Sequence, residues 1–97
     1  MLSIVFQPPE TILESLGARA QAARLVLGWT RKTLAARSGV AESTIKRFER
    51  TGHIGTAALV QLAMALDMLD GLGSLFAPAP VQSIAQVTAK KRQRGSL

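Results

Sequence analysis

Apolar residues recur at steps of three or four along the first third of the chain, at Ile12, Leu16, Ala20, Ala23 and Leu27. This spacing predicts an amphipathic helix, because side chains three and four positions apart lie on one face of a helix. Pro9 suits its first turn, and Gly28 is placed to end it. Arg19 and Arg24 are expected on other faces of this helix.

Two shorter helical segments follow, and glycines separate them. Thr30 is the predicted N-cap of a helix over residues 31–38, since its hydroxyl can accept a hydrogen bond from an amide of the first turn. Gly39 is placed to end that helix. A third helix is predicted over residues 42–50, with Gly52 at its end.

The helical pattern continues into a leucine-rich region. Thr56 is the predicted cap of a fourth helix, whose apolar positions are Leu59, Leu62, Ala63 and Leu66. A fifth, short turn carries Leu69, Leu72, Leu75 and Phe76. This is more apolar surface than a small core needs, so the region either closes the core or contributes in part to a dimer interface.

The two ends of the chain differ from this helical centre. Residues 1–9 are expected to form an arm, in which Leu2, Ile4 and Phe6 alternate as in a short strand that could pair two chains. Residues 77–97 combine a proline-containing, extended linker with a basic tail whose apolar pattern fits a helix or a strand equally well. The predicted fold class is all-α, with one five-helix domain over residues 10–76.

Composition excludes several kinds of function. The chain has no cysteine and a single histidine, which rules out a disulfide framework, a thiol nucleophile and a cysteine- or histidine-built metal site. We therefore expect no metal and no cofactor. No apolar run is long enough to span a membrane and the start lacks the basic residues of a secretory signal, so we expect a cytoplasmic protein without membrane contact.

Charge is unevenly distributed along the chain. Twelve lysines and arginines against six acidic residues give a formal net charge of +6. Residues 19–50 carry eight of these bases and two of the acids, and residues 77–97 carry the other four bases and no acid. A basic block beside otherwise balanced segments predicts a polyanionic partner, with a merely solvated basic face as the alternative.

Residues 31–50 satisfy the demands of two helices that cross steeply through a short turn. Ala35 is small where the second helix packs over the first, and Gly39 can adopt a positive φ at the turn. The crossing point is buried by Leu34, Val40, Ile45 and Phe48. Together with the apolar stretch 59–66, this pattern resembles the Cro/CI (XRE) family of helix-turn-helix DNA-binding repressors over residues 16–76.

The resemblance implies a lambda-repressor-like domain that binds double-stranded DNA as a homodimer on a palindromic operator. It implies that the second helix of the pair reads base edges through Glu42, Ser43, Lys46 and Arg47. Contacts to the DNA backbone fall to Thr30, Arg31, Thr44 and Arg50. The tail offers further candidate contacts in Lys90, Lys91, Arg92 and Arg94. For Arg47, the alternative is an ion pair with Glu49.

The chain departs from the family pattern at two positions. Arg31 stands where relatives usually have glutamine, and Ala41 stands where they have a capping residue. Alanine offers no acceptor, so about 1 kcal/mol of cap energy is missing, although Glu42 partly compensates through its charge in the first turn. Outside the motif, Trp29 is expected in the core and His53 in a solvent-facing turn.

The order of parts also resembles small HipB-type antitoxins, which repress their own operon and hold a HipA-type kinase toxin. The expected function is therefore a repressor that acts as the antitoxin of such a toxin kinase; the alternative is a stand-alone regulator with no toxin partner. No enzymatic activity is expected, since Glu42 and Glu49 would lie roughly 10 Å apart by helix rise, too far for a retaining carboxylate pair. An RNA-binding module is disfavoured because the few aromatic residues are expected inside.

Overall fold

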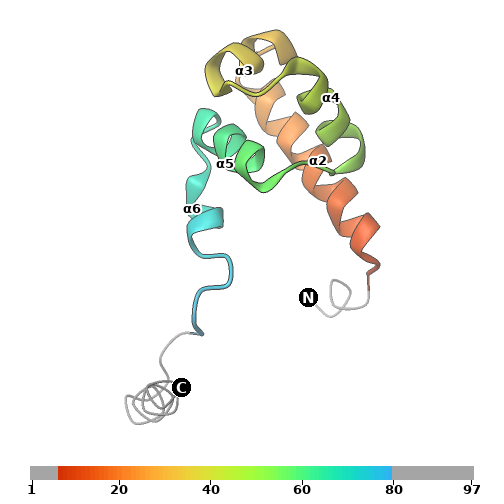
Figure 1. Ribbon diagram of the computed structural model, residues 1–97, viewed down its shortest axis with the longest axis vertical. Helices are drawn as coiled ribbons and strands as arrows, with labels where there is room; N and C mark the ends of the chain where they lie inside the picture. Colours follow the sequence, from red (N-terminus) through yellow and green to blue (C-terminus); the bar gives the residue numbers. More distant parts are fainter. Residues whose placement is uncertain (1–6, 80–97) are drawn as a thin grey trace.

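The computed structural model describes residues 7–79, which form five α-helices (Figure 1). These are α2 (Pro9–Val26), α3 (Arg31–Ser38), α4 (Glu42–Thr51), α5 (Thr56–Ala65) and α6 (Leu69–Gly73). No strand occurs between residues 7 and 79. The all-α prediction is confirmed for this part of the chain, whereas the predicted arm strand over residues 2–6 and the basic tail lie outside the described residues.

The longest helix, α2, begins at Pro9 as predicted, with Pro8 in an extended conformation before it. Its middle residues Leu16, Ala20 and Ala23 pack against the core. The two ends of the predicted apolar stripe, Ile12 and Leu27, are exposed instead. The packing therefore uses a shorter part of the stripe than the sequence pattern suggested.

The core is small and aliphatic apart from one aromatic ring. Its buried members are Leu34, Val40, Ile45, Phe48, Leu62 and Leu66. They come from α3, the turn after it, α4, and α5 with its C-cap residue. Helix α3 packs on both α4 and α5, and α2 packs on α4. Trp29 is half-buried against this cluster, as expected.

Helices α2 and α4 approach each other at two glycines. A Cβ atom added to Gly17 would overlap the carbonyl oxygen of Phe48. Gly52, which ends α4 in a left-handed conformation with φ of 82°, lies against the backbone of Leu13 in the same way. The absence of a side chain at these two positions lets the helices pack backbone to backbone.

The start of α5 differs from the prediction. Gly55, in an extended conformation, is the N-cap residue, and Thr56 is already the first helical residue. The hydroxyl of Thr56 therefore does not cap the helix; no side chain hydrogen-bonds the first amides of α5. The predicted inward face of this helix is confirmed by Leu62 and Leu66, which are buried.

The leucine-rich region beyond Leu66 contributes little to the core. Leu72 is half-buried, while its exposed apolar neighbours are Met68, Leu69, Leu75 and Phe76. Phe76 is 95% exposed and has a positive φ of 62°. This apolar surface is thus available for contacts beyond the core. No helix among the described residues is long and apolar enough to cross a membrane.

Candidate nucleic-acid interface

Local hydrogen bonds define the two helices α3 and α4 and the turn between them. The Thr30 hydroxyl accepts a hydrogen bond of 3.1 Å from the Thr33 amide, which confirms the predicted N-cap. Gly39 ends α3 with φ of 77°, and its amide donates to the Ala35 carbonyl at 2.9 Å. The Ser38 hydroxyl accepts from the Val40 amide at 3.1 Å and closes the turn.

Helix α4 has one buried face and one exposed face. Ile45 and Phe48 are fully buried and anchor the helix, as predicted. The exposed side chains of the same helix are Glu42, Ser43, Lys46, Arg47 and Arg50, while Thr44 is half-buried. The structure therefore brings the four predicted base-reading residues together on the outer surface of one helix.

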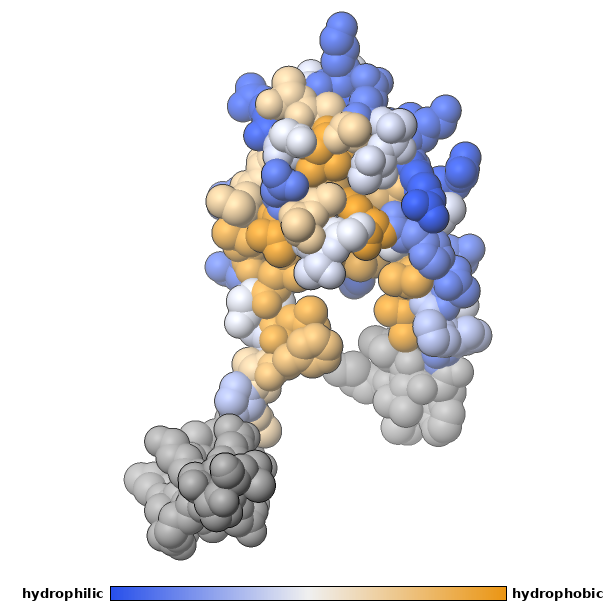
Figure 2. All heavy atoms as spheres, viewed as in Figure 1, coloured by the Kyte–Doolittle hydropathy of each residue, from blue (hydrophilic) through white to orange (hydrophobic). Residues whose placement is uncertain are grey.

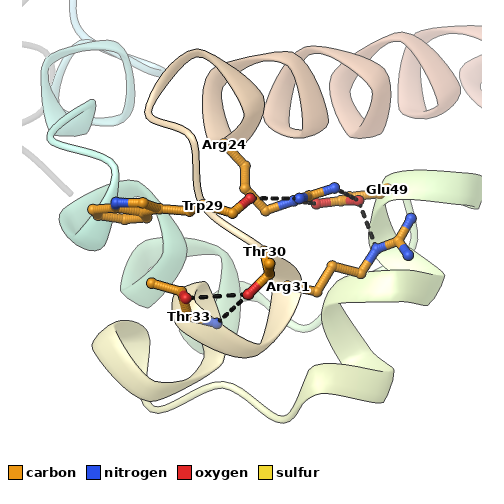
Figure 3. Close-up of polar contacts among 6 residues, drawn as sticks. All are labelled: Arg24, Trp29, Thr30, Arg31, Thr33 and Glu49. Atoms are coloured by element: carbon orange, nitrogen blue, oxygen red, sulfur yellow. Dashed lines mark hydrogen bonds and ion pairs between the residues drawn. The ribbon is translucent and has the colours of Figure 1, made fainter.

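A buried ion cluster joins this helix to α2 and α3 (Figure 3). The Glu49 carboxylate accepts two hydrogen bonds from Arg24, 2.7 Å from its Nε and 3.1 Å from its Nη2. Arg31 donates from its Nε to the same carboxylate at 2.9 Å. Arg24 also donates from Nη1 to the Trp29 carbonyl at 2.8 Å. One carboxylate thus connects three helices, and Arg24 extends the cluster to the loop between α2 and α3.

This cluster corrects two expectations. The sequence predicts Arg24 away from the inner face of α2, but the residue is only 6% exposed because Glu49 neutralises it inside the domain. An ion pair between Arg47 and Glu49 is the alternative that the sequence allows, but the Glu49 carboxylate pairs with the arginines of α2 and α3 instead. In the described part of the chain, Arg47 has no acidic partner within ion-pair distance.

Arg31 has two faces. Its Nε holds Glu49, while its terminal nitrogens point away from that contact in Figure 3. About a third of the side chain is exposed. Arg31 therefore positions α4 from the first turn of α3 and still leaves part of its side chain exposed.

The surface around α4 is electropositive. Besides Arg47, the exposed cations Lys32, Lys46 and Arg50 have no acidic partner within ion-pair distance in residues 7–79. Figure 2 shows hydrophilic surface on the side of the molecule where α4 lies and hydrophobic surface over α5 and α6. Glu42 is the one acidic side chain exposed on α4. A polyanion would meet a net positive field on this side.

The first turns of α4 and α5 offer backbone N–H donors. Ala41, as predicted, caps α4 without a side-chain hydrogen bond, and Gly55 caps α5 in the same way. The first amides of these helices have no acceptor within their own helix. Such amides, with the helix dipole behind them, attract anions.

Two contacts outside the predicted site fix neighbouring side chains. The Arg37 guanidinium lies 4.6 Å from the centre of the Trp29 ring, a cation–π distance. His53, expected to face solvent, is exposed but lies 3.0 Å from the Glu10 carboxylate through its Nε2. This contact ties the start of α2 to the loop after α4.

Sequence reasoning missed Arg24 and Glu49, yet a signal for one of them was present. Arg24 lies seven residues after Gly17, which faces α4, and four after Ala20, which packs against the core, so helical spacing places it on the same inner side. Because charged side chains are usually exposed, the charge of Arg24 led to a predicted surface position despite this helical spacing. Its partner Glu49 lies 25 residues away, and no local pattern connects the two.

The predicted tail contacts at residues 90–94 lie outside the described residues. Within residues 7–79 no three histidine, aspartate or glutamate side chains are grouped as metal ligands. Searches of the sequence against models of known protein families and against curated proteins gave no match.

Proposed function

We propose that this protein is a sequence-specific DNA-binding repressor whose α4 enters the major groove. The observation that carries the proposal is the two-sided character of α4. Ile45 and Phe48 bury one side completely, while polar and basic side chains cover the other. An α-helix fits the width of the major groove, where side chains can reach base edges.

Each outward side chain of α4 has a suitable base partner. Lys46 or Arg47 can donate to the O6 and N7 acceptors of guanine, and Glu42 can accept from the N4 amine of cytosine. Ser43 can act as donor or acceptor. A good bidentate contact of this kind discriminates between bases by about 1–3 kcal/mol. These side chains would therefore determine which sequence is bound.

Contacts to phosphates would supply most of the affinity. Arg50 at the end of α4 and Thr30 before α3 are exposed, and about a third of the Arg31 side chain is exposed as well. The unsatisfied amides at the starts of α4 and α5 add uncharged donors. Such contacts orient the domain but do not distinguish sequences.

Repression of a palindromic operator would follow from pairing of two chains. A two-fold dimer places its recognition helices about 34 Å apart, in successive major grooves on one side of the duplex. The exposed apolar residues Leu69, Leu75 and Phe76 supply surface suited to such pairing. We expect a pseudo-palindromic site with half-sites one helical turn apart.

Selection of bound duplexes from a random pool tests the proposal, followed by footprinting of the selected site. The wild-type chain should enrich one pseudo-palindromic sequence. Lys46→Ala should change the preferred base at particular positions, whereas Arg50→Ala should weaken all duplexes alike. Arg19→Ala, which removes the same charge beside α5 and α6, is the matched control and should change neither. Enrichment of no sequence, or the same loss for all three variants, would contradict the assignment.

A protein partner is a second candidate, favoured by apolar side chains exposed away from the core. Val26 at the end of α2 is 86% exposed and Phe76 is 95% exposed. We propose that such surface holds a HipA-type toxin kinase, which would make the repressor an antitoxin. Co-purification of the full chain with the product of the adjacent gene should yield a stable complex. If the neighbouring gene encodes no kinase or its product does not bind, the chain is a stand-alone regulator.

A further inference from the structure

An apolar groove of about 490 Å³ lies between α2 and the α5–α6 segment. Its lining includes Leu16, Ala20, Phe48, Leu62, Ala63 and Leu72. Arg19 is the one charged residue among the lining side chains. Figure 2 shows hydrophobic surface bordering the hollow between α2 and the α5–α6 segment. A groove of this size that stayed open to water would leave a large apolar area of the domain unburied.

The segment that precedes α2 has the composition to cover this groove. Five of residues 1–6 are apolar, and Leu2, Ile4 and Phe6 alternate so that an extended chain presents all three on one side. The groove is open along one side, so the backbone of an extended segment would keep polar groups in contact with water while its side chains are buried.

The distance from the start of α2 matches the length of this segment. Leu16 is seven residues after Pro9, about 10 Å along the helix axis, and Ala20 is about 16 Å along it. An extended chain rises about 3.3 Å per residue, so a segment that turns back at Pro8 carries Ile4 about 13 Å and Leu2 about 20 Å along α2. The apolar side chains then reach the level of the groove.

Other occupants fit less well. The C-terminal tail reaches its first apolar residue, Val81, only after a stiff proline-containing linker, and it would bring the bases of residues 90–94 toward Arg19. A second copy of the chain competes only at the concentration of free protein, whereas an attached segment has an effective concentration in the millimolar range. Reach, composition and charge all favour the chain's own N-terminal segment.

We propose that residues 2–6 fold back along α2 and bury Leu2, Ile4 and Phe6 in the groove of the same chain. This docking does not depend on DNA binding. It gives the groove an occupant from within the chain, and it removes the segment from pairing with another chain as a strand. The apolar side chains of α6 that flank the groove remain free for a second molecule.

Disulfide trapping in the full chain tests this docking, because the natural sequence contains no cysteine. Ile4→Cys combined with Ala63→Cys places one thiol on the segment and one in the groove lining. Mild oxidation should form an intrachain disulfide, identified by peptide mass mapping. Its rate should be at least tenfold higher than for Ile4→Cys with Ala36→Cys, which lies on the exposed surface of α3.

The tail and the second copy are tested in the same experiment. Ile84→Cys with Ala63→Cys reports on the tail and should react at the slow rate of the surface control. Faster trapping of the tail, mainly interchain disulfides in the Ile4 pair, or equal rates for all pairs would each overturn the proposal. As an independent measure, replacement of Leu2, Ile4 and Phe6 by serine should increase binding of an apolar dye several-fold, whereas serine at Val81, Ile84 and Val87 should not.

Discussion

Glu49 shows how one charged residue can be tolerated inside so small a core. It is 7% exposed, and the loss of hydration of its carboxylate is a cost that only close partners offset. Arg24 supplies two hydrogen bonds and Arg31 a third. Among the described residues, no buried side-chain nitrogen or oxygen lacks a hydrogen-bond partner. The cluster therefore adds little net stability but is sensitive to the loss of any member.

Glu49→Gln removes the charge while it keeps the size of the side chain. Arg24 would then be a buried cation without a counter-charge, so we expect the free energy of unfolding to fall by about 3–5 kcal/mol. Urea denaturation followed by circular dichroism measures this change. Glu14→Gln, the same change at an exposed position in the middle of α2, should alter stability by less than about 0.5 kcal/mol. Equal effects of the two variants would show that the cluster is not important for the fold.

Residue-scale features were only partly predictable from the sequence. The inward positions of Ile45 and Phe48 follow from helical periodicity, which is a local property. The burial of Arg24 depends on a partner on another helix, and the choice of Arg31 rather than Arg47 as the neighbour of Glu49 depends on how α3 and α4 cross. Such pairings arise from tertiary geometry, which a single sequence does not display.

At the scale of the helices, ends set by a local signal were predicted well. Thr30, Gly39 and Gly52 act as expected because a side-chain cap or a left-handed glycine operates within a few residues. The N-cap of α5 is Gly55, one position before the predicted Thr56, and both residue types occur at helix starts. The choice between adjacent candidates depends on backbone conformation rather than on residue type.

The start of α4 offers a position where stability can be gained. Ala41 has the extended conformation of an N-cap residue but no acceptor for the amides of the first turn. Ala41→Ser should therefore raise the free energy of unfolding by about 1 kcal/mol. Thermal and urea denaturation of the purified variant measure the gain. The same substitution at Ala36, an exposed position within α3, should be neutral or slightly destabilising, and a gain of similar size there would refute a capping effect.

The close contact of α2 with α4 leaves no room for a methyl group at Gly17. Gly17→Ala would place its Cβ against the Phe48 carbonyl and push the helices apart. We expect a loss of about 1–3 kcal/mol or more, although alanine is the better helix former. Gly71→Ala in α6, where nothing lies within 4 Å of the added atom, should stabilise by up to about 1 kcal/mol. Denaturant unfolding of both variants separates the two effects, and a stabilised Gly17→Ala would contradict the packing.

At the scale of the whole molecule, charge and apolar surface lie on different helices. The uneven charge along the sequence predicted a basic block, and the exposed cations around α4 place it in space. The apolar groove was not predictable in the same way. Its lining comes from α2, α4, α5 and α6, and only the packed arrangement shows that α6 leaves space beside α2.

Salt dependence tests whether the basic side of the molecule contacts phosphates. The logarithm of the DNA-binding constant should fall linearly with the logarithm of salt concentration, with a slope of about 0.9 for each neutralised phosphate. Arg50→Ala should make this slope shallower by about 0.9, as measured by fluorescence anisotropy on one duplex. Arg19→Ala should leave the slope unchanged. If both variants alter it equally, net charge rather than a defined contact governs the affinity.

The Glu49 carboxylate, shared by Arg24 and Arg31, has a consequence for any molecule that binds the exposed face of α4. A helix held at one point by two neighbours cannot tilt without giving up short, charge-assisted contacts in a dry environment. The outer face is thus preorganised, and complex formation spends little entropy on ordering the protein. Adjustment of shape then falls to the other molecule, so an easily deformed duplex would be bound more tightly than a stiff one with identical contacted bases.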